Sequence, residues 1–136
     1  MRIVTTALLA ALLGSSAAGQ SGTTAFAGNP AVKVSEGGVE RLVEDLPRDR
    51  AVNLACVISR IGDSYYWASR ENVELLRVDA GAFVTFIALN GSGYVRVTLP
   101  EARTAAAAMG PTEGRFDYVE HLLIGLRSVT YYGHRR

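Results

Sequence analysis

The middle of the chain alternates apolar with polar residues, which is the period of a strand with one buried face. Four such runs lie at 51–60, 64–70, 73–78 and 94–99, and between the last two a run at 82–89 is apolar on both sides, which is typical of a central strand covered on both faces. The segment 73–78 also fits a helix. Asn90-Gly91 is the strongest turn signal between the runs, because both residues tolerate the positive φ of a two-residue hairpin. The alternation therefore predicts an antiparallel meander.

On either side of this meander, apolar residues recur at spacings of three and four, which is the period of an amphipathic helix. The spacing predicts a short helix over 39–46 and an alanine-rich helix over 101–109, which begins after Pro100. A final helix is predicted from Thr112, a residue that can cap its first turn. The residues on its apolar face are Phe116, Val119, Leu122, Leu123, Leu126 and Val129.

These elements together predict an α+β fold class. An antiparallel β-meander of about five strands would be packed on one face by an N-terminal helix and two C-terminal helices. The other face of the sheet would be left open. Such a face can be solvated or can meet a ligand or partner.

Residues 1–18 have the layout of a secretory signal peptide, which we expect to be cleaved. Arg2 gives a positive start, and an apolar run over 3–13 is followed by small residues. That run is too short to form a stable membrane span, and no cysteine follows it for a lipid anchor. We therefore expect export to a periplasm or the cell exterior, without membrane anchoring after cleavage.

The remainder divides into two parts. Residues 19–36 are rich in Gly, Ser, Thr and Ala and are expected to form a flexible leader. Residues 37–136 are then a single α+β domain, because their number suits one compact core. Loss of Arg2 with the signal would leave equal numbers of basic and acidic residues. This balance argues against nucleic acid as a partner, since counterion release needs a clustered basic surface.

Few residues suggest catalysis. Cys56, the single cysteine, lies on the apolar side of its predicted strand, so we interpret it as a core residue rather than a nucleophile. His121 follows Asp117 by one turn of the final helix, so an i,i+4 contact could orient its imidazole. His121 and His134 have no partner at zinc-ligand spacing. We therefore predict no catalytic residues, no metal and no cofactor.

The most distinctive cluster combines aromatic and arginine side chains on strands. Alternation places Tyr66 and Arg70 on one face of their strand, and Tyr94 and Arg96 on the non-core side of another. A ring beside a guanidinium is a common recognition surface for sugars, carboxylates or proteins. These four residues are the predicted ligand or partner site. The alternative is that tyrosine and arginine only cover a solvated sheet.

The leading hypothesis is a small exported, non-catalytic binding or interaction module that uses the open sheet face. Its partner would be a protein, a small molecule or a second copy of the chain. A second hypothesis is a small hydrolase or transferase that uses His121 with Asp117. A third is a carrier of apolar ligands, with a cavity between the sheet and the helices.

Overall fold

The computed structural model describes residues 22–47, 54–108 and 116–136. The expected signal peptide, residues 1–18, lies outside these described residues. Strands dominate the described part, together with one short α-helix and two 3₁₀ turns. The strands are β1 (Thr23–Gly28), β2 (Lys33–Glu36), β3 (Val39–Leu42), β4 (Cys56–Ile61), β5 (Ser64–Trp67), β6 (Val73–Ala80), β7 (Phe83–Ala88), β8 (Gly93–Thr98), β9 (Tyr118–Ile124) and β10 (Arg127–Gly133). The helical pieces are η2 (Val43–Asp45), η4 (Pro100–Ala102) and α2 (Arg103–Ala107).

All ten strands belong to one antiparallel sheet, in the order β1-β4-β5-β6-β7-β8-β9-β10-β2-β3. From β4 to β10 each strand pairs with the next along the chain. The exceptions are β1, which pairs with β4, and β2, which pairs with β10. The β2–β3 hairpin therefore extends the sheet beyond β10, and β3 is its outermost strand.

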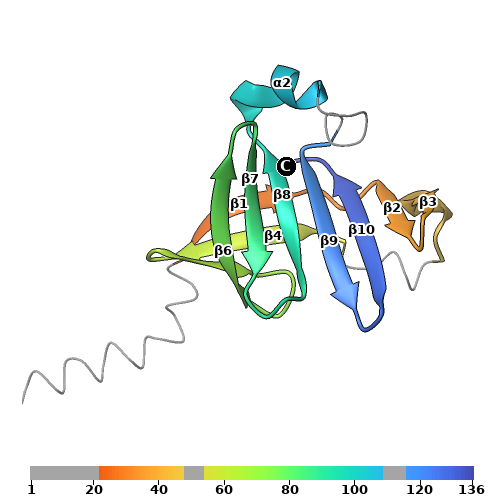
Figure 1. Cartoon of the computed structure of the whole chain (residues 1–136), viewed down its shortest axis with the longest axis horizontal. Coiled ribbons are helices and arrows are strands. Elements are labelled where there is room, and N and C mark those ends of the chain that lie inside the picture. The colour runs from red at the N-terminus through yellow and green to blue at the C-terminus, as the bar shows by residue number, and fades with distance from the viewer. Residues whose placement is uncertain (1–21, 48–53, 109–115) are drawn as a thin grey trace, which may run out of the picture.

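The sheet closes on itself through the end of β1 and the last residues of the chain. Gly28 forms a bridge with Arg135. The N–H of Arg136 donates to the carbonyl of Ala27 at 3.0 Å, and the N–H of Asn29 donates to the carbonyl of His134 at 2.6 Å. Figure 1 shows β1 and β4 crossing behind the upright strands β6 to β10. The residues that continue the chain after β10 thus pair with the end of β1, whose edge would otherwise be unpaired.

Closure gives the sheet an inside, and the inside is the hydrophobic core. Its fully buried side chains include Ile58, Trp67 and Val95, each 0% exposed. Tyr118, also 0% exposed, lies where two glycines make room for its ring. A Cβ added at Gly28 or at Gly133 would overlap that ring. The absence of side chains at these two positions is therefore a packing requirement.

The predicted fold class was wrong. The five strands expected between 51 and 99 are present as β4 to β8, but they make up only half of a ten-stranded sheet. No helices line one of its faces, since the described residues contain a single short α-helix, α2, at one end of the sheet (Figure 1). The physical reason is that closure buries the inner face against itself, so the core needs no helical layer.

The final helix was the largest error. Residues predicted to continue a helix from Thr112 form β9 and β10, joined by a turn at Gly125, where φ is 61°. A spacing of three and four fitted the apolar residues because Leu122 lies inside while Leu123 and Ile124 are exposed near the turn. β9 also provides the hydrogen-bonding partner along one edge of β8, which a helix could not do because its backbone groups bond within the helix.

Smaller corrections concern the other segments. The predicted helix 39–46 is strand β3 followed by η2, and the predicted helix 101–109 is reduced to η4 and α2. Within 19–36, which we expected to be a flexible leader, residues 23–28 and 33–36 are β1 and β2. These short polar strands have weak patterns of their own and gain their order from pairing with β4 and β10.

The packing of Tyr118 makes a first prediction. Gly133→Ala should lower the free energy of unfolding by about 1–3 kcal/mol, because the new methyl group forces the Tyr118 ring to move. Urea unfolding followed by circular dichroism measures this change. Ser128→Ala, on an exposed position of the same strand, should stay within about 0.5 kcal/mol of wild type. Equal stability of the two variants would contradict the packing argument.

Candidate functional site

Glu120 is the one charged residue with 0% exposure among the described residues. It lies on β9 and its side chain points to the inside of the closed sheet, between the inward positions of Tyr118 and Leu122. Trp67 Nε1 donates to its Oε2 at 2.9 Å. Arg70 Nη2 donates to Oε1 at 3.0 Å, and Arg70 Nε lies 3.4 Å from Oε2. The carboxylate is therefore paired and hydrogen-bonded, as a buried charge must be.

Arg70 reaches Glu120 from the turn that follows β5. Glu71 and Asn72 have φ of 59° and 55°, and the N–H groups of Arg70 and Asn72 donate to the carbonyl of Trp67 at 2.9 and 3.1 Å. This tight turn directs the guanidinium back into the sheet, where it also lies over the Tyr131 ring at 5.6 Å. Burial lowers the pKa of Arg70, but the hydrogen bond and the charge of Glu120 outweigh it and raise that pKa.

A pocket of about 360 Å³ opens at this end of the sheet, which we call the mouth. Its wall includes apolar side chains of β5, β6 and β9 and polar groups of the turns between strands. The lining residues are Trp67, Ser69, Arg70, Glu71, Val73, Asn90, Ser92, Leu122, Leu123 and Ile124. Arg70 is the cation of this pocket among the described residues, and its side chain is 27% exposed. The mouth pocket thus places an oriented guanidinium beside an apolar wall.

Cys56 lies behind this pair and is 0% exposed. Burial, and next the negative charge of Glu120, raise the pKa of its thiol well above the ordinary value. A thiol that is buried and held protonated is a poor nucleophile. The structure therefore agrees with the interpretation of Cys56 as a core residue.

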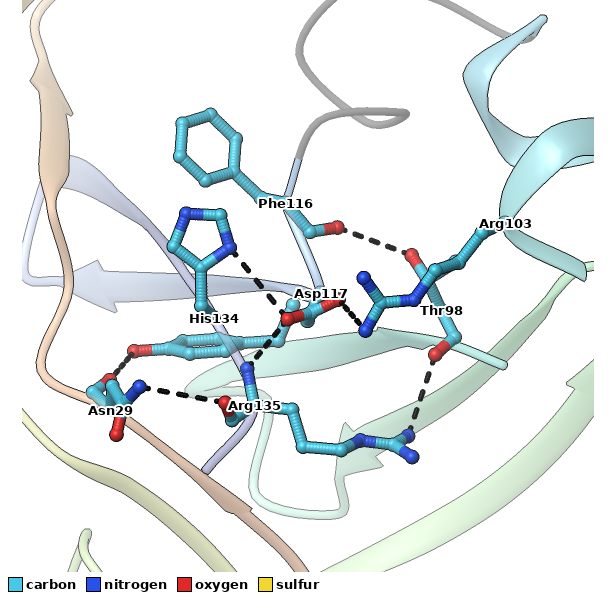
Figure 2. Close-up of polar contacts among 8 residues, drawn as sticks. Asn29, Thr98, Arg103, Phe116, Asp117, His134 and Arg135 are labelled. Atoms are coloured by element: carbon cyan, nitrogen blue, oxygen red, sulfur yellow. Dashed lines mark hydrogen bonds and ion pairs between the residues drawn. The ribbon is translucent and has the colours of Figure 1, made fainter. Parts of the chain in front are cut away.

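A second polar cluster lies at the opposite end, around Asp117 (Figure 2). The Asp117 carboxylate is paired with Arg103 of α2. It also accepts a hydrogen bond from the backbone N–H of Arg135 at 2.8 Å and lies 3.6 Å from His134 Nδ1. Tyr118 donates its hydroxyl to the carbonyl of Asn29 at 2.7 Å. These contacts hold residues 134 and 135 against β1, so we interpret the cluster as the clasp that keeps the sheet closed.

The predicted contact between His121 and Asp117 does not form. It required a helix, but in a strand these residues lie about 13 Å apart at the usual rise. His121 Nδ1 instead lies 2.9 Å from Thr130 Oγ1, and the imidazole is stacked on Tyr94 with the ring centroids 5.1 Å apart. The structure therefore does not assemble the acid–base pair that the enzyme hypothesis used.

The four predicted site residues do not share one surface. Tyr94 and Arg96 lie together on the outside of β8, where Arg96 lies over the Tyr94 ring at 5.8 Å and the Phe83 ring at 5.4 Å. Tyr66 is half-buried on β5, which is separated from β8 by two strands. Arg70 alone belongs to the mouth pocket.

Glu120 was missed by the sequence analysis, because its segment was predicted to be a helix and Glu120 is not on the apolar face of that helix. The residues on either side of Glu120 in the sequence could have indicated that it is buried. Once 118–124 is taken as a strand, Glu120 falls on the same side as Tyr118 and Leu122, which marks it as a buried carboxylate that needs a partner. The sequence around Glu120 does not identify that partner, since Arg70 is 50 positions away.

Comparison with models of protein families, with curated proteins and with solved structures gives no match. In the described ranges, no helix is long and apolar enough to cross a membrane. The described residues also contain no group of three or more His, Cys, Asp or Glu side chains that could hold a metal ion. The function must therefore be argued from the geometry of the site.

Removing Arg70 tests the buried pair. Arg70→Met should lower the free energy of unfolding by about 3 kcal/mol, because it leaves the Glu120 carboxylate buried without a cation. Adding Glu120→Gln to this variant should restore at least half of the loss, since the amide oxygen still accepts from Trp67. Arg60→Met, on an exposed residue, should be nearly neutral in the same urea unfolding experiment. A double variant as unstable as the single one would refute the pairing.

The raised pKa of Cys56 gives a further expectation. The native protein should not react with a chromogenic disulfide reagent at mildly alkaline pH, because the thiol is both buried and protonated. One equivalent should react after unfolding in urea. Rapid reaction of the native protein, measured by absorbance of the released thiolate, would show that this part of the core is open to solvent.

Proposed function

We propose that this chain is a non-catalytic binding protein that takes a small, partly apolar molecule into the mouth pocket. The ligand's apolar body lies against Val73, Leu122 and Leu123, and a carbonyl, carboxylate or similar acceptor faces Arg70. The signal layout of residues 1–18 supports export, so the protein meets this ligand outside the cytoplasm.

The observation that carries the proposal is the Glu120–Arg70 pair beside the pocket. A buried ion pair is weak support for stability, because apolar residues of similar volume often stabilise a core equally well. This pair instead fixes one guanidinium in a single orientation at the edge of a pocket. Glu120 accepts from Nε and Nη2, and within the described residues the N–H groups of Nη1 have no acceptor, so they can donate to a ligand.

The wall of the pocket supports a partly apolar ligand. Leu123 and Ile124 are 51% and 48% exposed, and Leu126 at the tip of the same hairpin is fully exposed. Apolar side chains gathered beside an opening favour binding rather than solvation. The polar rim of Asn90 and Ser92, in which Ser92 donates to Asn90 Oδ1, provides further hydrogen-bonding groups.

The chain contains a single tryptophan, Trp67, which lies in the pocket wall and serves as a reporter. The probe is 8-anilinonaphthalene-1-sulfonate, which combines an apolar body with an anionic acceptor. We expect the probe to bind the native protein saturably, and we expect energy transfer from Trp67 to the bound probe, measured by fluorescence. Absence of saturable binding would overturn the proposal.

Two leucines of nearly equal exposure provide the matched control. Leu123→Glu places a carboxylate on the pocket wall and should weaken binding of the probe roughly tenfold, about 1.4 kcal/mol. Leu76→Glu adds the same charge on β6 at 53% exposure, outside the mouth pocket, and should change binding less than twofold. Equal effects of the two variants would place the probe elsewhere on the surface.

A further inference from the structure

A second, smaller pocket lies where β7 begins and β8 ends, on the α2 side of the sheet. Its volume is about 110 Å³, which is room for a few water molecules or for an anion of a few heavy atoms. The lining residues are Ala25, Phe26, Arg77, Val84, Phe86, Val97, Leu99 and Arg135. Two arginines thus border a pocket whose other walls are apolar.

Among the described residues, no carboxylate pairs with the guanidinium of Arg135, although other contacts hold this residue in place. Its backbone N–H donates to Asp117, and Nη2 lies 3.4 Å from the carbonyl oxygen of Thr98 (Figure 2). Its Nε is buried and has no hydrogen-bond partner among the described residues. The guanidinium lies over the Phe26 ring at 5.7 Å. A buried N–H without an acceptor costs free energy, so the contacts within the described residues leave this guanidinium incompletely paired.

Arg77 faces the same pocket from β6. Its Nε donates to Asp79 Oδ1 and its Nη1 donates to the Tyr65 hydroxyl, both at 2.9 Å. These two bonds fix the guanidinium over the Tyr65 ring, at 5.6 Å. They leave Nη2 as a donor with no acceptor among the described residues. Asp79 offsets part of the charge of Arg77, and an anion in the pocket would be attracted by both guanidinium groups.

We propose that this pocket binds a short-chain carboxylate, independently of the mouth pocket. The carboxylate lies between Arg77 and Arg135 and accepts from the N–H groups that their guanidinium ends present to the pocket. The hydrocarbon lies on the apolar wall of Phe26, Val84 and Val97. An inorganic oxyanion would meet the two arginines but would gain nothing from that wall. The apolar wall therefore selects an organic acid over sulfate or phosphate.

The test uses nuclear magnetic resonance of ¹⁵N-labelled full-length protein, titrated with sodium butyrate and, separately, with sodium sulfate at the same ionic strength. We expect saturable shifts of the amides of Arg77, Arg135 and their neighbours, and at least tenfold tighter binding of butyrate than of sulfate. Shifts that are absent or do not saturate would overturn the proposal. Sulfate that binds as tightly as butyrate would also overturn it.

Variants locate the site. Arg135→Met keeps the backbone bond to Asp117 and should weaken butyrate binding at least tenfold, whereas Arg136→Met removes the same charge one residue away and should change it less than twofold. Equal losses in the two variants would mean that butyrate is attracted by the positive charge of the surface in general, and would refute the site.

If Arg135→Met does not fold, Arg77→Met provides the same test, because the partners of Arg77, Asp79 and Tyr65, are not fully buried and the variant should fold. Leu123→Glu should leave butyrate binding unchanged, which separates this pocket from the mouth pocket.

Discussion

The structure depends on the pairing of β1 with the last residues of the chain. Without the bonds between 27–29 and 134–136, the sheet would have an open seam and Trp67, Tyr118 and Glu120 would meet water. The loop that this pairing closes is long, but loop-closure entropy grows only slowly with length. Asp117 contributes by binding the backbone of Arg135 and the side chain of Arg103 together. The polar cluster at this end is thus part of what keeps the apolar core dry.

A closed sheet has an interior and two ends, and this division organises the polar chemistry of the molecule. Glu120 projects into the interior near the mouth, where Arg70 can still reach both the carboxylate and the pocket. At the α2 end, Arg77 and Arg135 lie beside core residues, and the buried carboxylate of Asp117 binds the backbone N–H of Arg135. Arginine suits both places because it keeps its charge when buried and donates in fixed directions. The outer surface carries the remaining aromatic and arginine pairs, such as Tyr94 with Arg96.

Local pattern was informative where strands pair with their sequence neighbours. The runs that became β4 to β8 alternate or, in β7, are continuously apolar, and turns such as Asn90-Gly91 lie at the expected positions. The pattern misled at 118–133, because the hairpin tip exposes Leu123 and Ile124 while an acidic residue occupies an inward position. One inward glutamate breaks the period of two, and the remaining apolar residues then match a helix. For the site, Arg70 was identified as notable, but its partner Glu120 was not.

The sequence by itself determined which segments of the middle are strands, where they turn, and that Cys56 belongs to the core. These properties depend on contacts within a few residues, through side-chain alternation and turn conformation. Only the tertiary structure decided that β1 and β2 form, that the sheet closes without helices, and that Glu120 meets Arg70 and Trp67. Those outcomes depend on partners that are distant in sequence, and their free energy comes from pairing and burial that no local pattern encodes.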